Sequence, residues 1–290
     1  MWALENIVIY GFFLGAIYLL VAMGFSIICG VLRIFHLGYA YIFPFTVYVT
    51  WFFMSELGMA LGWSIAGMVI LQFLLGIVIY KGLVRPYFEK EEILFTGLLL
   101  VALIVEKVCN YFYPPQAGVY IPSTIMEGST QIGVVYMPTQ FVVGGIIGLA
   151  LAGLFILFFL KTRIGMGIRA LSQGVQESKI VGINIEGLYY FTMVLVLVPV
   201  IVGTLIIAPV WAVEPKMGWL YLNTAILVSV IGGLGNLRGT IIAAFLLGMV
   251  HAAMCFVIGE PRLMNAAGMV LAIVVLVIRP TGLAKSETLW

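Results

Sequence analysis

Few side chains in this sequence could do chemistry, and several of them lie inside long apolar runs. Glu106 and Lys107 are adjacent within the run 93–113, and His251 lies near the middle of another run. If these runs cross a membrane, an unpartnered charge near the bilayer centre costs about 2.5 to 3.5 kcal/mol. Such side chains either pair structurally, which is the interpretation we favour, or form the polar lining of a pathway. Adjacent helix residues point about 100° apart, so we expect Glu106 and Lys107 to need separate partners.

The residue groups that enzymes and metal sites require do not occur together in this sequence. There is no G-x-x-x-x-G-K-[ST] phosphate loop, so we do not expect the chain to hydrolyse ATP itself. No His, Cys and Glu cluster has metal-ligand spacing, and there is no Asp for a Ser, His and Asp arrangement. Cys29, Cys109 and Cys255 lie in apolar runs, which predicts neither disulfides nor a zinc site. A net charge of +2 is too small to indicate a nucleic-acid partner.

The elements that position these side chains are expected to be membrane-spanning helices. Hydrophobic residues make up 63% of the chain and charged residues 9%, whereas about a quarter of a soluble domain is charged. At about 20 residues per span, the 290 residues hold eight to ten helices. We expect an all-α polytopic membrane protein with a single domain, 1–290, and about nine spans. These are 7–31, 38–55, 62–80, 93–113, 139–160, 188–210, 220–234, 240–257 and 265–278.

The basic residues predict the orientation, because short cytoplasmic loops carry the excess of Lys and Arg. With the N-terminus outside and the C-terminus in the cytoplasm, eleven basic residues fall inside and two, Lys216 and Arg262, fall outside. The eleven are Arg33, Lys81, Arg85, Lys90, Lys161, Arg163, Arg169, Lys179, Arg238, Arg279 and Lys285. The first apolar run is too long for a signal peptide and lacks a basic region before it, so we expect a retained span.

The longest stretch that cannot lie in a membrane is TRIGMGIRALSQGVQESKIVGI, residues 162–183. Its apolar residues Ile168, Leu171 and Val175 fall on one helix face, and glycines flank them. We expect an amphipathic helix near 167–181, outside the bilayer. Such a short helix is marginal alone, so its apolar face packs either on a partner or on the inner surface of this chain.

A glycine-rich stretch, IGGLGNLRG, occupies residues 231–239. Four glycines in nine residues must interrupt a helix, because Gly costs about 1 kcal/mol relative to Ala in a helix interior. One interpretation is a discontinuous helix that lines a transport site. The other is a tight turn at the cytoplasmic face, anchored by Arg238. Asn223, Thr224 and His251 lie on the two flanking spans and are candidates for the polar groups of a permeation route.

The segment 113–137 is expected outside and holds several Pro and Gly residues but no basic residue. It is long for a connection between helices, which commonly takes about 2 to 8 residues. It is either a tolerated external loop or part of a surface on which an external protein docks.

Four segments of this sequence resemble the permeases of branched-chain amino-acid ABC importers, the LivH-like type, which has urea and amide relatives. GAIYLLVAMGFSIICGVLR resembles the family's opening helix, and residues 162–183 resemble its cytoplasmic loop. VSVIGGLGNLRGTIIAAFLLG resembles its glycine-rich signature, and IRPTGL its C-terminal tail. The family usually shows an Asn-x-x-His-Gly pattern after the first helix, where this chain has His36, Tyr39 and Ala40. It usually has an acidic or amide residue where Gly174 stands.

The resemblance implies one permease half of an importer in the inner membrane. Its partners would be a second homologous permease, two cytoplasmic ATPases that bind ATP and Mg, and an external solute-binding protein. The segment 162–183 would then seat in a groove of an ATPase. The coupling residues would be Gly165, Arg169, Leu171, Val175, Glu177 and Gly182. The translocation-pathway residues would be His36, Tyr39, Asn223, Thr224, Gly232, Gly233, Gly235 and His251.

Other classes remain open at this point. A urea or short-chain amide permease would share the same fold and the same partners. An ion-coupled secondary transporter would need no ATPase, but its usual intramembrane carboxylates are missing here. A structural membrane protein would bind no solute.

Overall fold

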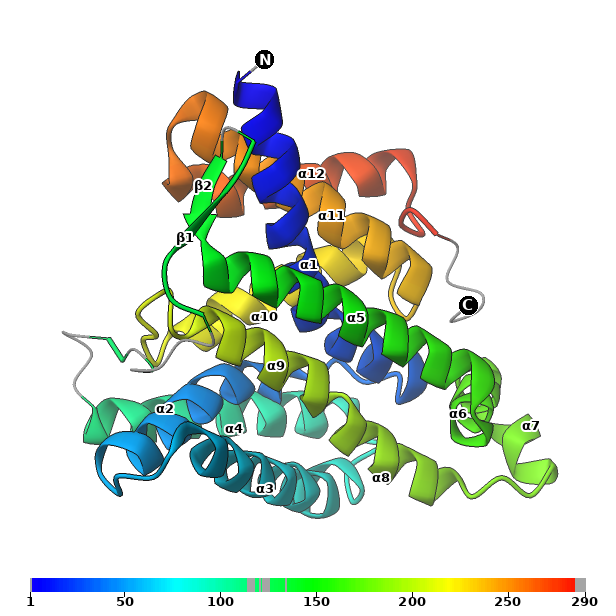
Figure 1. Cartoon of the computed structure of the whole chain (residues 1–290). Helices are drawn as coiled ribbons and strands as arrows, with labels where there is room; N and C mark the ends of the chain where they lie inside the picture. The colour runs from blue at the N-terminus through cyan, green and yellow to red at the C-terminus, as the bar shows by residue number, and fades with distance from the viewer. Residues whose placement is uncertain (1, 114–117, 120, 122–125, 134, 285–290) are drawn as a thin grey trace.

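The computed structural model describes residues 2–113, 118–119, 121, 126–133 and 135–284. It consists of helices with one small β-hairpin (Figure 1). The α-helices are α1 (Trp2–Val31), α2 (Ile42–Ser55), α3 (Leu61–Ile79), α4 (Glu91–Phe112), α5 (Thr139–Lys161), α6 (Arg163–Gln173), α7 (Val175–Ile180), α8 (Ile185–Leu195), α9 (Leu197–Ile207), α10 (Met217–Gly232), α11 (Leu237–Ala253) and α12 (Met264–Ile278). Short 3₁₀ or π segments are η1 (Leu37–Tyr41), η2 (Tyr80–Val84), η3 (Met254–Ile258) and η4 (Pro261–Leu263). Strands β1 (Ser129–Ile132) and β2 (Val135–Pro138) pair antiparallel.

Within the described residues, seven helical segments are long and apolar enough to cross a membrane. They are Ala3–Val31, Leu37–Ser55, Leu61–Val84, Thr139–Lys161, Ile185–Ile207, Leu237–Ile258 and Pro261–Ile278. The prediction of an all-α polytopic membrane protein is therefore confirmed. Helices also occupy the two remaining predicted stretches, as α4 and the shorter α10. The number of crossings beyond seven stays a prediction.

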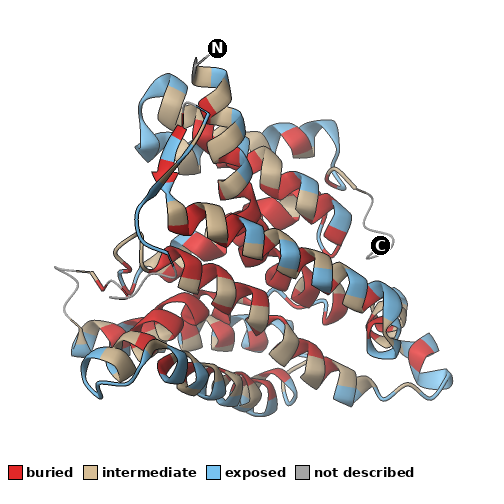
Figure 2. Ribbon diagram, viewed as in Figure 1, coloured by how far each residue is buried: buried red, intermediate tan, exposed pale blue. Residues whose placement is uncertain are grey.

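Helix α1 lies at the centre of the bundle, where it packs against α5, α9, α10 and α11 (Figures 1 and 2). Its middle residues, such as Leu14, Leu20 and Phe25, are fully buried. An apolar helix in this position needs no polar face, which explains why α1 is hydrophobic all round.

Small residues let α1 and α11 approach closely. A side chain on Gly11 would lie 2.9 Å from the Cα atom of Met249, and one on Gly248 would lie 2.5 Å from the carbonyl oxygen of Gly11. Gly11 and Gly15 are four residues apart, so they share the helix face that meets α11. Close packing of this small-xxx-small kind holds membrane helices together through van der Waals contact.

The connections expected inside lie together at one end of the bundle. The Arg33 guanidinium donates a hydrogen bond to the carbonyl oxygen of Ser172, with 3.0 Å between the atoms. Arg85 forms an ion pair with Glu186 at 2.9 Å. These contacts join the end of α1 to α6 and the connection before α4 to the start of α8.

The segments that are expected outside contact one another and do not take part in the contacts described above. Val119 and Val213 form an isolated antiparallel bridge between the connection before β1 and the connection before α10. Gly133, at the tip of the hairpin, lies close to Ile9 near the N-terminus. These contacts agree with the predicted grouping of the loops that they join, while the side of the membrane that each group faces stays a prediction.

Candidate translocation pathway and coupling surface

The glycine-rich stretch forms a tight turn between α10 and α11, which pack against each other. Gly233 and Gly235 have positive φ angles of 100° and 78°, which L-residues rarely adopt. The Asn236 side chain accepts a hydrogen bond from the Gly239 N–H at 3.0 Å and so caps α11. The interruption of the helix was expected, and the structure shows that it is a tight turn. Its place at the cytoplasmic face and its relation to a transport site stay predictions.

The C-terminal tail closes over this turn. The Leu283 N–H donates to the carbonyl oxygen of Ile231 at 2.8 Å, and the Ala284 N–H donates to that of Gly232 at 3.2 Å. The end of a helix leaves carbonyl groups without intrahelical partners, and the tail satisfies two of them. The glycine-rich stretch and the C-terminal tail both carry the family resemblance. Gly232 and Ile278 are 46 residues apart in the sequence, yet the two segments form one structural unit.

His251 is paired with a tyrosine in the core. Its Nδ1 lies 2.8 Å from the Tyr18 hydroxyl oxygen, and the side chain is only 2% exposed. Its Nε2 faces Gly268 of α12, where an added Cβ would lie 3.1 Å away. The pairing agrees with a hydrogen-bonded packing residue, and Tyr18 is a partner that sequence reasoning missed.

Tyr39 and α10 meet through an aromatic stack. The Tyr39 hydroxyl donates to the carbonyl oxygen of Val21 at 2.6 Å. Phe43, which contacts Tyr39, stacks on Tyr221 with 4.7 Å between ring centroids. Thr224, one turn along α10, is buried and donates to the carbonyl oxygen of Leu220.

The predicted pathway residues therefore gather around α1 without forming a single cluster. Tyr39, Thr224 and His251 are buried against the core of the chain, and Asn223 is half-buried.

His36 lies in the connection between α1 and η1 and is 3% exposed. A side chain on Gly38 would lie 3.0 Å from its Cε1 atom. Burial lowers the pKa of the His36 imidazole to about 4, because loss of hydration disfavours the charged form. His36 is thus a neutral buried residue at neutral pH.

The segment 162–183 contains two helices, α6 and α7, in place of the single helix expected near 167–181. The Thr162 hydroxyl accepts a hydrogen bond from the Gly165 N–H at 3.0 Å, so α6 begins earlier than expected. Gly174 has an extended backbone and ends α6. The expected boundaries were wrong because the capping threonine and the Gly174 break outweigh the apolar periodicity.

The apolar face of α6 packs on this chain itself. Ile168 and Leu171 are fully buried, and Val175 is half-buried against the same core. The expectation that Leu171 is available to anchor a partner is therefore corrected, since periodicity shows which residues share a face but not what covers it. Gly165 contributes by allowing α6 to approach α5, where a side chain would lie 2.5 Å from the carbonyl oxygen of Phe158.

The exposed apolar residues of this segment follow the second helix. Ile180 is 85% exposed and Val181 is 79% exposed, and Gly182 follows with a positive φ of 81°. Figure 1 shows α7 at the edge of the molecule, beyond α6. Arg169 donates to the carbonyl oxygen of Leu160 at 3.5 Å, whereas Glu177 is exposed on α7.

Glu106 is held by three donors. Trp219 Nε1 donates to one carboxylate oxygen at 2.7 Å, and Lys107 Nζ and Asn110 Nδ2 lie 3.2 and 3.5 Å from the other. The expectation that Glu106 and Lys107 could not pair was wrong, because the long Lys side chain turns back to its neighbour. The favoured interpretation, structural pairing, agrees with this geometry, and it ties α4 to α10.

Within the described part of the chain, no three His, Cys, Asp or Glu side chains gather as a metal site requires. Cys29, Cys109 and Cys255 are free.

Comparisons with known proteins agree over almost the whole length. The family described as "Branched-chain amino acid transport system / permease component" matches residues 7–279. The high-affinity branched-chain amino acid transport system permease protein BraD of Pseudomonas aeruginosa is 22% identical over 94% of this chain and 93% of that protein. LivH of Escherichia coli K12, described in the same words, is 22% identical over 94% of this chain and 92% of that protein.

A solved structure shares the fold. PsaBC from Streptococcus pneumoniae in complex with Fab aligns with a TM-score of 0.53 and 15% sequence identity. The alignment covers 97% of this chain and 93% of that one.

Proposed function

This chain belongs to the branched-chain amino acid transport system permease family, and we propose that it forms half of the translocation pathway of an ABC importer. The solutes are branched-chain or other hydrophobic amino acids. The observation that carries the proposal is the family match over residues 7–279 on a bundle of membrane-spanning helices. The chain is a multi-pass protein of the inner membrane.

The partners we propose are those that membership of the permease family implies. Two cytoplasmic ATPases bind ATP and Mg and supply the energy, which agrees with the absence of a phosphate-binding loop from this chain. A second homologous permease completes the pathway, and an external binding protein delivers the solute. Because the binding protein selects the solute, Asn223, Thr224 and His251 influence the rate of passage more than the preferred solute.

The docking surface for an ATPase is the tip formed by Ile180 and Val181, together with the exposed charge of Glu177. Two apolar side chains that are about four-fifths exposed outside the spans favour burial in a partner groove. Burying one such side chain stabilises a complex by roughly 1.5 to 3 kcal/mol, whereas an exposed charge pair contributes about 0 to 1 kcal/mol. The buried face of α6 then transmits movement of α7 to α1 and α5.

Reconstituted transport tests this proposal. The chain is co-expressed with candidate ATPase, second-permease and binding-protein subunits, placed in liposomes, and supplied with radiolabelled leucine, urea or acetamide. We expect leucine uptake that requires hydrolysable ATP and the binding protein. Uptake of urea or acetamide alone would place the chain with the amide relatives. Uptake driven by an ion gradient without ATPases would contradict the proposal and identify a secondary transporter.

A further inference from the structure

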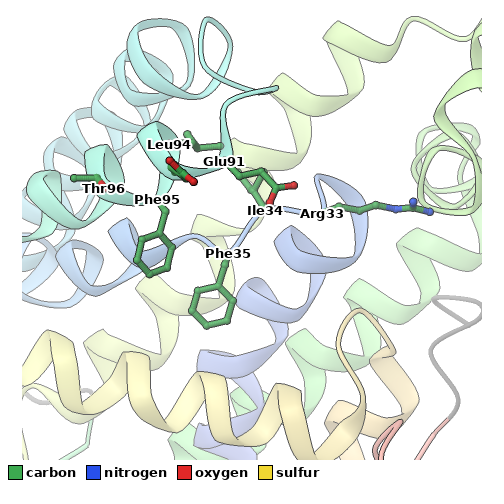
Figure 3. Close-up of a pocket in the computed structure, with 8 residues that line it drawn as sticks. Arg33, Ile34, Phe35, Glu91, Leu94, Phe95 and Thr96 are labelled. Atoms are coloured by element: carbon green, nitrogen blue, oxygen red, sulfur yellow. The ribbon is translucent and has the colours of Figure 1, made fainter.

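A cavity of about 530 Å³ lies between the end of α1 and the start of α4, at the end of the bundle that carries α6 (Figure 3). Its size falls within the range of about 300 to 1,000 Å³ that small-molecule sites occupy. The lining residues are Arg33, Ile34, Phe35, Glu91, Glu92, Leu94, Phe95 and Thr96.

One part of the cavity is aromatic. The ring centroids of Phe35 and Phe95 are 6.5 Å apart, and the side chains are 37% and 46% exposed. Figure 3 shows the two rings side by side. Ile34 and Leu94 add apolar surface beside them. An apolar group of a few carbon atoms could lie against these rings and bury surface that is now exposed.

The other part is acidic. Glu91 and Glu92 occupy the first turn of α4, a position where acidic side chains stabilise a helix. Neither forms an ion pair within the described residues, and both are exposed. The lining thus offers two unpaired carboxylates next to two phenyl rings, an arrangement that suits an ammonium group by charge and by cation–π attraction.

The third charged residue of the lining, Arg33, binds a group outside the cavity. The Arg33 guanidinium donates to the carbonyl oxygen of Ser172 in α6 at 3.0 Å, and Figure 3 shows its side chain extending away from the rings. Arg33 also has a positive φ of 55°, so its backbone conformation is restricted. A ligand carboxylate therefore meets less favourable charge here than a ligand ammonium.

We infer that this cavity binds the solute at the inner end of the chain, with the ammonium group on Glu91 and Glu92 and the apolar side chain against Phe35 and Phe95. The ligand class is a small primary amine with a branched apolar group, which includes branched-chain amino acids. The amino-acid identity of the solute rests on the proposed function. The amine preference rests on the cavity alone.

Three probes with the same apolar group test the amine preference. Full-length protein in lipid nanodiscs is titrated calorimetrically with leucine, with isoamylamine, which lacks the carboxylate, and with 4-methylpentanoate, which lacks the amine. We expect leucine and isoamylamine to bind and 4-methylpentanoate not to bind. Equal binding of all three probes, binding of the acid alone, or no binding at millimolar concentrations would overturn the inference.

Variants then locate the site. Replacing Glu91→Gln and Glu92→Gln together is expected to weaken isoamylamine binding at least tenfold, because both carboxylates lose their charge. Glu89→Gln removes an exposed carboxylate just before α4 that does not line the cavity, and it is expected to leave binding unchanged. Unchanged binding in the double variant, or equal loss in the control, would place the amine elsewhere and end the inference.

ATP-driven uptake separates this inference from the proposed function. Leucine uptake that is insensitive to the double variant, together with absent amine binding, would leave the proposed function standing and remove the cavity site. Amine binding that depends on Glu91 and Glu92, without leucine uptake in the assembled transporter, would leave the cavity site standing and contradict the proposed function.

Discussion

At the scale of single residues, the burial of His36 has a consequence for pH dependence. Its pKa of about 4 lies below the ordinary value of 6.5, so between these values the unfolded chain binds a proton that the folded chain does not. Stability is therefore lost as pH falls through this window, by at most about 3 to 4 kcal/mol at about 1.4 kcal/mol per pKa unit. Replacing His36→Gln removes this contribution.

Thermal unfolding of the detergent-purified protein at pH 7.5 and pH 5 measures the effect. We expect the drop in the unfolding midpoint between the two values to be smaller in His36→Gln than in the natural protein. Parallel drops in both proteins would show that His36 already carries a proton in the folded state.

Residue partners were the least predictable feature of the chain. The sequence marked Glu106 and His251 as polar groups inside apolar runs, because their types contrast with their neighbours. It could not name Trp219 or Tyr18 as their partners, since these lie 113 and 233 residues away and carry no distinctive spacing. Partner identity depends on helix packing, which a pattern along one segment does not record.

At the scale of elements, the turn between α10 and α11 should be intolerant of side chains. Gly235 has a φ of 78°, and an added Cβ would lie 2.6 Å from the Cα atom of Gly30. We expect Gly235→Ala to destabilise the protein by about 1 to 3 kcal/mol. Gly153 in α5 has open space around it, so Gly153→Ala should be neutral or stabilising by up to about 1 kcal/mol.

Chemical or thermal unfolding of the two purified variants compares these sites directly. A Gly235→Ala variant as stable as the natural protein would mean that the turn can relax away from α1.

The segment 162–183, which we propose docks on an ATPase, leads to a second prediction at this scale. Ile180→Asp with Val181→Asp places charges on an exposed tip, so the isolated chain should keep its thermal stability while its affinity for the ATPases falls at least tenfold. Leu171→Asp buries a charge in the core and should instead destabilise the isolated chain by several kcal/mol. Titrating each purified variant with the ATPase subunits, after a thermal-stability measurement alone, distinguishes the two surfaces.

Normal ATPase binding by the stable tip variant would remove Ile180 and Val181 from the docking surface. The sequence indicated which residues of 162–183 share a face, because helical periodicity is local. It did not indicate that α6 turns this face inward, because that depends on contacts with α1, α5 and α8.

At the scale of the whole molecule, the helices were predictable and their arrangement was not. Apolar runs of span length located the helices, because hydrocarbon thickness fixes both their length and their composition. The central place of α1 depends on Gly11, Gly15 and Gly248, which look like ordinary glycines in an apolar run. The hairpin of β1 and β2 lies in the predicted external segment, where neither strand has a long apolar pattern.

The unequal distribution of Lys and Arg between the two groups of loops predicts the orientation of the molecule in the membrane. Ser129 in β1 and Lys179 in α7 are both exposed and lie in the two different groups of loops. Each is replaced by a single cysteine in a protein from which Cys29, Cys109 and Cys255 have been removed by substitution.

With an impermeant thiol reagent on intact cells, we expect Ser129→Cys to label at once and Lys179→Cys to label only after the membrane is opened. The reason is that eleven basic residues on the α7 side resist transfer across the membrane, against two on the other side. Labelling of both positions from the same side would refute the span assignment between them. Labelling with the sides exchanged would keep the spans but reverse the orientation, and would place α7 where no cytoplasmic ATPase could reach it.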